Sequence, residues 1–299
     1  MIVQAAVGEQ ASRWRQRLTG PVLLADRGSE DAAVARRAAA DIAARTGIPL
    51  RIVTAWAVPA VARVTPTSSS LNVRGVYEDS ARAAQQEIRA HLAPGSVVGA
   101  GYVAQGNAPA IVAETANMID ASMVVIGSRA GRGLGGRLMG LLPEALVRAV
   151  RRPVLVVRGQ TADWPPTSIV ILDGDSSLDR VVAAEGATLA RILAVPAVLV
   201  GVTRDVRRAG VEARSDPSLE SFRNEARRRA ARLEAECGAE VSSWVTTGEA
   251  IEVLLGLASD PRVLVVAGRR LQHHGLGKVV SALVHGASGP VLVVPEPSA

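Results

Sequence analysis

The sequence RRPVLVVR at residues 151–158 recurs as SGPVLVVP at residues 288–295, and this repeat indicates how the chain is organised. A second pair of similar segments precedes it, MVVIGSR at 123–129 and VLVVAGRR at 263–270. Both pairs are about 140 residues apart, which indicates that the 299-residue chain contains two copies of one unit.

Each copy alternates apolar runs with helical patterns. The apolar runs are continuous, which is typical of strands buried on both faces of a parallel sheet. We therefore predict an α/β fold of two tandem Rossmann-like domains, each a five-stranded parallel sheet sandwiched by helices. The predicted domains are residues 1–158, with a core from about residue 20, and residues 168–299. Between them GQTADWPPT (159–167) is predicted to be a stiff linker, because its paired prolines fit neither a helix nor a central strand.

The individual elements follow from apolar runs, capping residues and breakers. The predicted strands are residues 21–26, 50–56, 97–104, 122–127 and 153–158 in the first copy, and 168–173, 197–202, 240–245, 262–267 and 290–294 in the second. The predicted helices are residues 29–45, 77–93, 109–119 and 143–150, then 177–194, 217–236, 249–258 and 277–286. Ser29 is expected to cap the first helix and Gly47 to follow its end.

Composition argues against several classes of protein. No apolar run reaches the ~18 residues of a membrane-spanning helix, and the first residues lack the pattern of a signal peptide. The single cysteine, Cys237, cannot form an intrachain disulfide, so we expect a cytoplasmic protein. The net charge is +6, but the arginines are interleaved with acidic residues, as in RNEARRRAARLEAE (223–236). That pattern is typical of solvated helix faces, and we expect neither a nucleic acid nor a membrane as partner.

The segment VVIGSRAGRGLGGRLMGLLPEAL (124–146) carries the main functional signal. A predicted strand ends at Gly127, and a glycine-rich loop leads to a helix. Glycines and a helix N-terminus present backbone N–H groups to an anion, and Arg129 adds a forked donor. The alternative is a solvated bend that only sets the angle of the helix, and the spacing alone leaves both readings open. The GRGLGG inside the loop is not a dinucleotide fingerprint, because no acidic residue ends the next strand.

The whole pattern resembles the universal stress protein family in its tandem two-domain form. In that family the ligand loop reads G-x2-G-x9-G-[S/T] and is followed by a helix and a PVLVV strand. Here Gly127, Ala130, Gly140 and Leu141 stand at the motif positions, so the second glycine and the hydroxyl residue are replaced. The resemblance implies that the chain binds ATP or another adenine nucleotide, with Mg²⁺ as its companion ion.

The resemblance also implies which residues form the site. Asp26 or its neighbour Arg27 matches the acidic residue at the end of the first strand, and Ala55 matches the residue that touches adenine. The nucleotide-binding residues implied for the first domain are Ala25, Asp26, Arg27, Ala55, Ile126, Gly127, Arg129, Ala130, Gly140, Leu141 and Leu142. The second domain has a shorter loop, suited to a smaller anion, and its candidate residues are Asp173, Val202, Gly268, Arg270, Gly277 and Lys278.

No catalytic constellation or metal-ligand set is recognisable in the sequence. We therefore expect a non-enzymatic, adenine-nucleotide-binding module of the stress response, with the site in the first domain. The alternative is a degenerate member of the same fold that binds no nucleotide and acts as an interaction scaffold, and slow ATPase activity also stays open. The fifth strands end each sheet as apolar edges, which need a partner. The resemblance implies that the edges of the two domains pair with each other or with those of a second chain, and we predict an intramolecular pseudo-two-fold and a homodimer.

Overall fold

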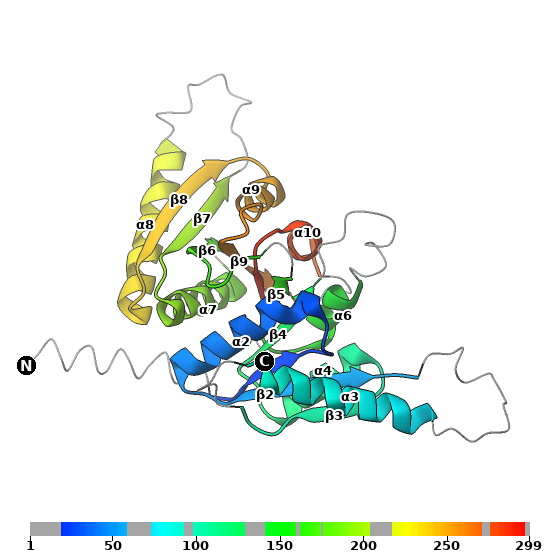
Figure 1. Ribbon diagram of the computed structural model, residues 1–299. Helices are drawn as coiled ribbons and strands as arrows, with labels where there is room; N and C mark the ends of the chain where they lie inside the picture. The colour runs from blue at the N-terminus through cyan, green and yellow to red at the C-terminus, as the bar shows by residue number, and fades with distance from the viewer. Residues whose placement is uncertain are drawn as a thin grey trace, which may run out of the picture. The chain divides into compact units, whose positions relative to one another are not determined.

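The computed structural model describes residues 19–58, 73–92, 98–128, 141–159, 162–174, 176–203, 217–270 and 276–296. The chain forms two compact units that divide after Gln160 (Figure 1). We call them the N-terminal domain, from Thr19 to Gln160, and the C-terminal domain, from Thr161 onward. None of the helices that the structure describes is both long and apolar enough to cross a membrane.

The N-terminal domain contains one parallel sheet in the strand order β3-β2-β1-β4-β5. Its strands are β1 (Val22–Ala25), β2 (Leu50–Trp56), β3 (Tyr102–Gln105), β4 (Met123–Ser128) and β5 (Val154–Arg158). The side chains of β1 and β4 are almost fully buried, because helices cover both faces of a parallel sheet.

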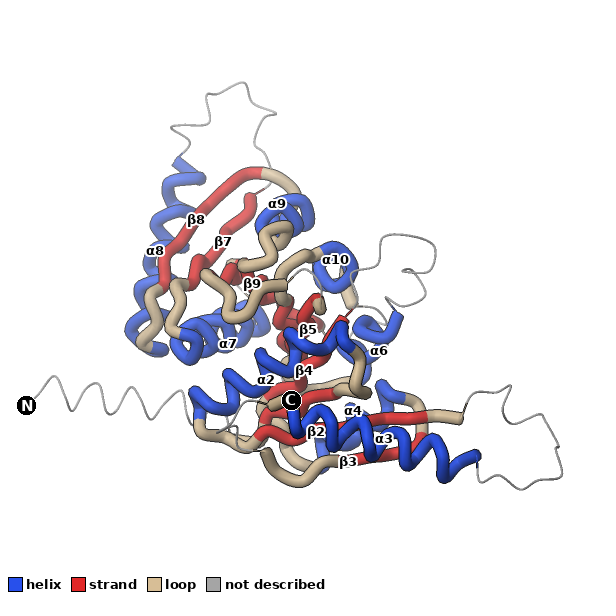
Figure 2. Tube along the Cα trace, in the orientation of Figure 1, coloured by secondary structure: helices blue, strands red, loops and turns tan. Residues whose placement is uncertain are grey.

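The helices of this domain are the short 3-10 turn η1 (Glu30–Ala32), α2 (Ala33–Thr46), α3 (Val73–Ala90), α4 (Ala108–Met118) and α6 (Leu141–Ala149) (Figure 2). Right-handed crossovers place α2 and α3 on one face of the sheet and α4 and α6 on the other. The end of α2 is fixed by Gly47, whose φ of 71° few other residues adopt. The start of α4 is capped by Asn107, whose side chain accepts a hydrogen bond from the Ala110 N–H.

The C-terminal domain repeats this plan with the strand order β10-β9-β6-β7-β8, all parallel. Its strands are β6 (Ser168–Leu172), β7 (Ala197–Thr203), β8 (Val241–Thr247), β9 (Val263–Arg269) and β10 (Val291–Pro295). Its helices are α7 (Ser177–Leu193), α8 (Pro217–Cys237), α9 (Ala250–Leu257) and α10 (Lys278–Gly286). A capping box between Ser176 and Asp179 fixes the start of α7.

The predicted fold class is therefore confirmed, and most elements end within a few residues of their predicted bounds. Two expectations differ. Ser29 makes no side-chain capping bond; instead its carbonyl accepts hydrogen bonds from the Ala32 N–H and the Arg36 guanidinium. The strand predicted at 97–104 is regular only from Tyr102; before it, Val98 pairs with Leu50 as an isolated bridge, and the carbonyls of Gly99 and Ala100 accept hydrogen bonds from arginine side chains.

Candidate functional site

The site expected in the N-terminal domain lies at the carboxyl edge of its sheet. There β1 ends between β2 and β4, and Ala25 is in register with Val53 on one side and Ile126 on the other. Asp26 follows directly, and its backbone N–H donates to the Val53 carbonyl at 3.1 Å. In an open parallel sheet this is the edge where ligands bind.

Asp26 is buried and its carboxylate is already engaged. Its side chain is 1% exposed and forms an ion pair with Arg36 of α2, with 2.5 Å between Oδ2 and Nε. Its Oδ1 accepts a hydrogen bond from the Gly28 N–H at 2.9 Å. Arg27, by contrast, is exposed. Asp26 therefore fixes the turn after β1 from its buried position, whereas the Arg27 side chain is accessible to solvent and solutes.

Gly127, the first glycine of the expected loop motif, is in close contact with the chain itself. A Cβ placed there would lie 2.9 Å from the Ala32 Cα, closer than real Cβ atoms come, and 3.0 Å from the Ala32 Cβ. Because η1 packs directly on this point of β4, only glycine fits. Packing alone therefore accounts for Gly127.

The remaining candidates of this domain surround the loop after β4. Ala55 is half-buried in β2, and Ile126 is buried in β4. Arg129, Ala130 and Gly140 lie outside the described residues. Leu141 is the first residue of α6, and Leu142 beside it is 41% exposed. Since α6 connects parallel strands β4 and β5, the N–H groups of its first turn lie at the same sheet edge.

The C-terminal domain places its candidates at corresponding positions. The Asp173 N–H donates to the Val200 carbonyl at 2.8 Å, so Asp173 is the counterpart of Asp26, and Val202 then corresponds to Ala55. Gly268 corresponds to Gly127, and a Cβ there would meet Val182 and Leu178 of α7. By these hydrogen bonds Asp26 is the residue that corresponds to Asp173, and Arg27 follows it by one position.

The last three candidates of this domain lie around α10. Gly277 precedes the helix with a φ of 73°, and Lys278 is its first residue. Lys278 and Arg270 are both exposed. No interaction joins them to Asp173 among the described residues, so the structure gives no assembled site from this set.

Asp173 is neutralised differently from Asp26. Its side chain is 3% exposed and its Oδ2 lies 3.0 Å from Arg229 Nη2. Arg229 belongs to α8, which follows the second strand of its domain, whereas Arg36 belongs to the helix after the first strand. Neither arginine could be identified from the sequence, because a helix with several arginines does not reveal which of them faces inward.

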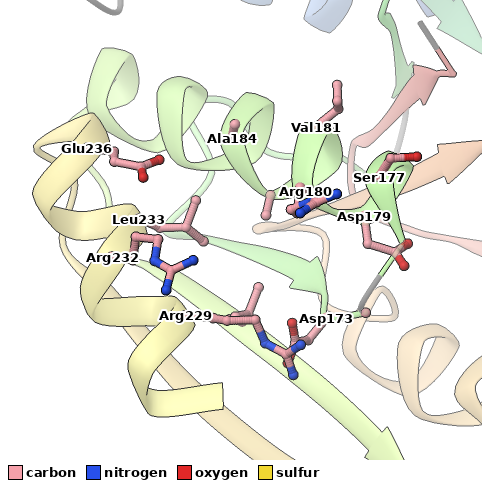
Figure 3. A pocket seen from close by; sticks show the side chains of 13 residues that line it. Asp173, Ser177, Asp179, Arg180, Val181, Ala184, Arg229, Arg232, Leu233 and Glu236 are labelled. Carbon is pink, nitrogen blue, oxygen red and sulfur yellow. The ribbon is translucent and has the colours of Figure 1, made fainter. Parts of the chain in front are cut away.

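A cavity of about 430 Å³ adjoins Asp173, between α7 and α8 (Figure 3). Its apolar surface comes from Ala183 and Ala184 of α7, Leu199 of β7 and Leu233 of α8. Apart from Asp173, the sequence analysis selected none of its residues. No group of three or more His, Cys, Asp or Glu side chains that could hold a metal occurs in the described part of the chain.

Comparisons with known proteins agree with this architecture. Residues 19–158 match the model of the universal stress protein family. A crystal structure of a universal stress protein from Archaeoglobus fulgidus DSM 4304 is similar over 93% of this chain and 100% of its own, with a TM-score of 0.65 and 12% identity. A protein of unknown function from Pseudomonas aeruginosa PAO1 is similar over 94% of both chains, with a TM-score of 0.59 and 13% identity. A search of curated proteins found no significant match.

The family match lies entirely within the N-terminal domain, whereas the structural likeness extends over both domains. At 12% identity that likeness shows the fold alone. The resemblance found in the sequence is thus confirmed: the N-terminal domain is a domain of the universal stress protein family.

Proposed function

We propose that the N-terminal domain, a universal stress protein domain, binds an adenine nucleotide at the carboxyl edge of its sheet. The observation that supports this most is the convergence of the ends of β1, β2 and β4 with the start of α6 at that edge. Adenine would lie over Ala25 and Ala55, and the phosphates would lie at the loop after β4 and the first turn of α6. Backbone N–H groups and the positive end of the helix dipole suit phosphate there.

The described residues at this edge would have different roles in nucleotide binding. Asp26 is held by Arg36 and by the Gly28 N–H, so it would orient the turn after β1 without contacting the phosphates. Arg27 is the exposed cation of the same turn and would pair with a phosphate oxygen. Leu141 lacks the hydroxyl of the family motif, and its backbone N–H would be the donor at that position.

In this proposal the protein is a binding module of the stress response that works in the cytoplasm, with ATP and Mg²⁺ as its first candidate ligands and slow ATP hydrolysis as an option. A phosphate-release assay decides that option. Homodimers formed through fifth-strand edges are part of the same proposal. Sedimentation at micromolar concentration tests them, and a single monomer peak would contradict them.

The binding test is calorimetric titration with ATP, ADP, AMP and cyclic AMP, each with and without Mg²⁺. Leu142→Asp places a negative charge in the first turn of α6, where it is compatible with the helix but repels phosphate. We expect this variant to lose binding. Met118→Asp is the matched control, because Met118 is 64% exposed at the end of α4, a helix that does not follow the loop. Absence of binding for all four nucleotides at millimolar concentration would refute the proposal.

A second candidate function is that of an interaction scaffold without nucleotide. It is favoured by the buried Asp26–Arg36 pair and by the packing of Gly127 against η1, since neither residue needs a ligand to explain it. A nucleotide that copurifies with the protein in stoichiometric amount would exclude this alternative.

A further inference from the structure

We propose that the groove between α7 and α8 in the C-terminal domain is a second binding site, which takes a small organic monoanion with an apolar body. The groove's volume of about 430 Å³ is within the range of small-molecule sites, about 300–1,000 Å³. All residues that line it belong to the C-terminal domain. The proposal is therefore independent of nucleotide binding in the N-terminal domain.

The groove exists because α7 carries a small residue where α2 carries a large one. Gly47 and Ala194, both left-handed, end α2 and α7. Arg36 precedes Gly47 by the same number of residues as Ala183 precedes Ala194, so Arg36 and Ala183 occupy equivalent positions. The same holds for Asp26 and Asp173, which lie further back in the two domains. In the N-terminal domain the Arg36 side chain runs along this space to Asp26. In the C-terminal domain Ala183 leaves the space beside Asp173 open.

The floor of the groove is apolar. Ala183, Ala184, Leu199 and Leu233 line it, and all four are buried side chains. An apolar ligand body of ring size would displace water from this floor, which is favourable in proportion to the area covered. Polar groups confined to the rim would then orient the ligand.

Two arginines provide the charge. Arg180 on α7 and Arg232 on α8 both line the groove and are exposed, and neither forms an ion pair with another described side chain. The third arginine of the groove, Arg229, is paired with Asp173, and the Asp179 carboxylate accepts hydrogen bonds from the Ser176 N–H and hydroxyl. The positive charge that a ligand meets is therefore that of Arg180 and Arg232, whose planar guanidinium groups suit carboxylate, sulfonate or phosphate.

The carboxylates limit the ligand to one negative group. Figure 3 shows Asp173 and Asp179 toward one end of the groove and Glu236 toward the other, with Arg180 on the side of Asp179 and Arg232 beside Glu236. A second anionic group at either end would be repelled. A ligand with a single negative group can pair with an arginine and keep its apolar body on the floor of the groove.

The test uses two fluorescent probes that share an aryl body. 8-Anilinonaphthalene-1-sulfonate carries one sulfonate, and N-phenyl-1-naphthylamine is its neutral analogue. We expect saturable binding of one sulfonate probe per folded chain, at least about tenfold tighter than the neutral probe, the factor expected for charge-assisted hydrogen bonds. Arg180→Ala and Arg232→Ala should each weaken the sulfonate probe about tenfold and change the neutral probe less than about twofold.

Two further variants complete the design. Ala183→Met fills the groove with a side chain similar in length to the stem of Arg36 and should weaken both probes. Arg228→Ala removes the same charge from the same helix outside the groove and should change neither. Circular dichroism verifies that each variant is folded. No saturable binding, equal affinity for the two probes, or binding unchanged by Arg180→Ala and Arg232→Ala would each overturn the proposal.

Discussion

Arg36 and Ala183 occupy the same position in the two domains, and this one difference is compensated on the neighbouring helix. Matching the buried residues of α3 (Ala81, Gln85 and Ile88) to those of α8 (Ala226, Ala230 and Leu233) aligns Ala84 with Arg229. The N-terminal domain therefore has arginine on its first helix and alanine on its second, and the C-terminal domain has the reverse. In both, one guanidinium group reaches the buried carboxylate after the first strand.

We predict that Arg36→Met destabilises the N-terminal domain by about 3 kcal/mol, because it leaves the buried Asp26 carboxylate without its counter-charge. Hydrogen exchange of peptides from β1 and α2 measures the loss locally. Arg37→Met is the matched control, since Arg37 is the exposed neighbour on the same helix. Equal exchange in both variants would contradict the prediction.

We predict that the N-terminal domain can be stabilised with its arginine on the second helix, as in the C-terminal domain. Arg36→Ala combined with Ala84→Arg rebuilds in the N-terminal domain the arrangement of the C-terminal domain. Ala84 lies close to the turn after β1, since a Cβ on Gly28 would be 3.2 Å from the Ala84 Cβ. We expect the double variant to be more stable than Arg36→Ala alone in thermal unfolding. A double variant that melts below the single one would show that the two helices are not interchangeable.

Gly127 and Gly268 occupy equivalent positions but should tolerate alanine differently. At Gly127 the new methyl group meets the backbone Cα of Ala32, whereas at Gly268 it meets the ends of the Val182 and Leu178 side chains. Side chains can rotate away and a backbone turn cannot, so Gly127→Ala should cost about 1–3 kcal/mol and Gly268→Ala clearly less. Urea unfolding of each variant, followed by exchange in the affected domain, measures the difference.

The turn between α9 and β9 predicts a pH effect. The Arg262 guanidinium and N–H both donate to Asp260 and hold the pKa of its carboxyl below the usual value. A depressed folded-state pKa stabilises the fold at pH values above the unfolded pKa, and this contribution disappears as the pH falls through the folded pKa. We expect Arg262→Ala to move the NMR titration of Asp260 to higher pH. An unchanged titration would show that the pair has no effect in solution.

The strands were predictable because continuous apolar runs are bounded by proline, glycine or aspartate. LRIVTAW at 50–56, for example, coincides with β2. The choice between Asp26 and Arg27 was not predictable, because it depends on the hydrogen bond from Asp26 to Val53 that sets the register. The groove beside Ala183 was missed for another reason: a small side chain becomes informative only when the two repeats are aligned on Asp26 and Asp173. That alignment, which pairs Arg36 with Ala183, depends on the same hydrogen bond that identifies Asp26.

The exchange of arginine between helices also constrains how the two repeats diverged. A repeat that lost one arginine before it gained the other would have had a buried aspartate carboxylate without a counter-charge. The order of substitutions with a viable intermediate is the opposite one, in which both helices carried the cation for a time.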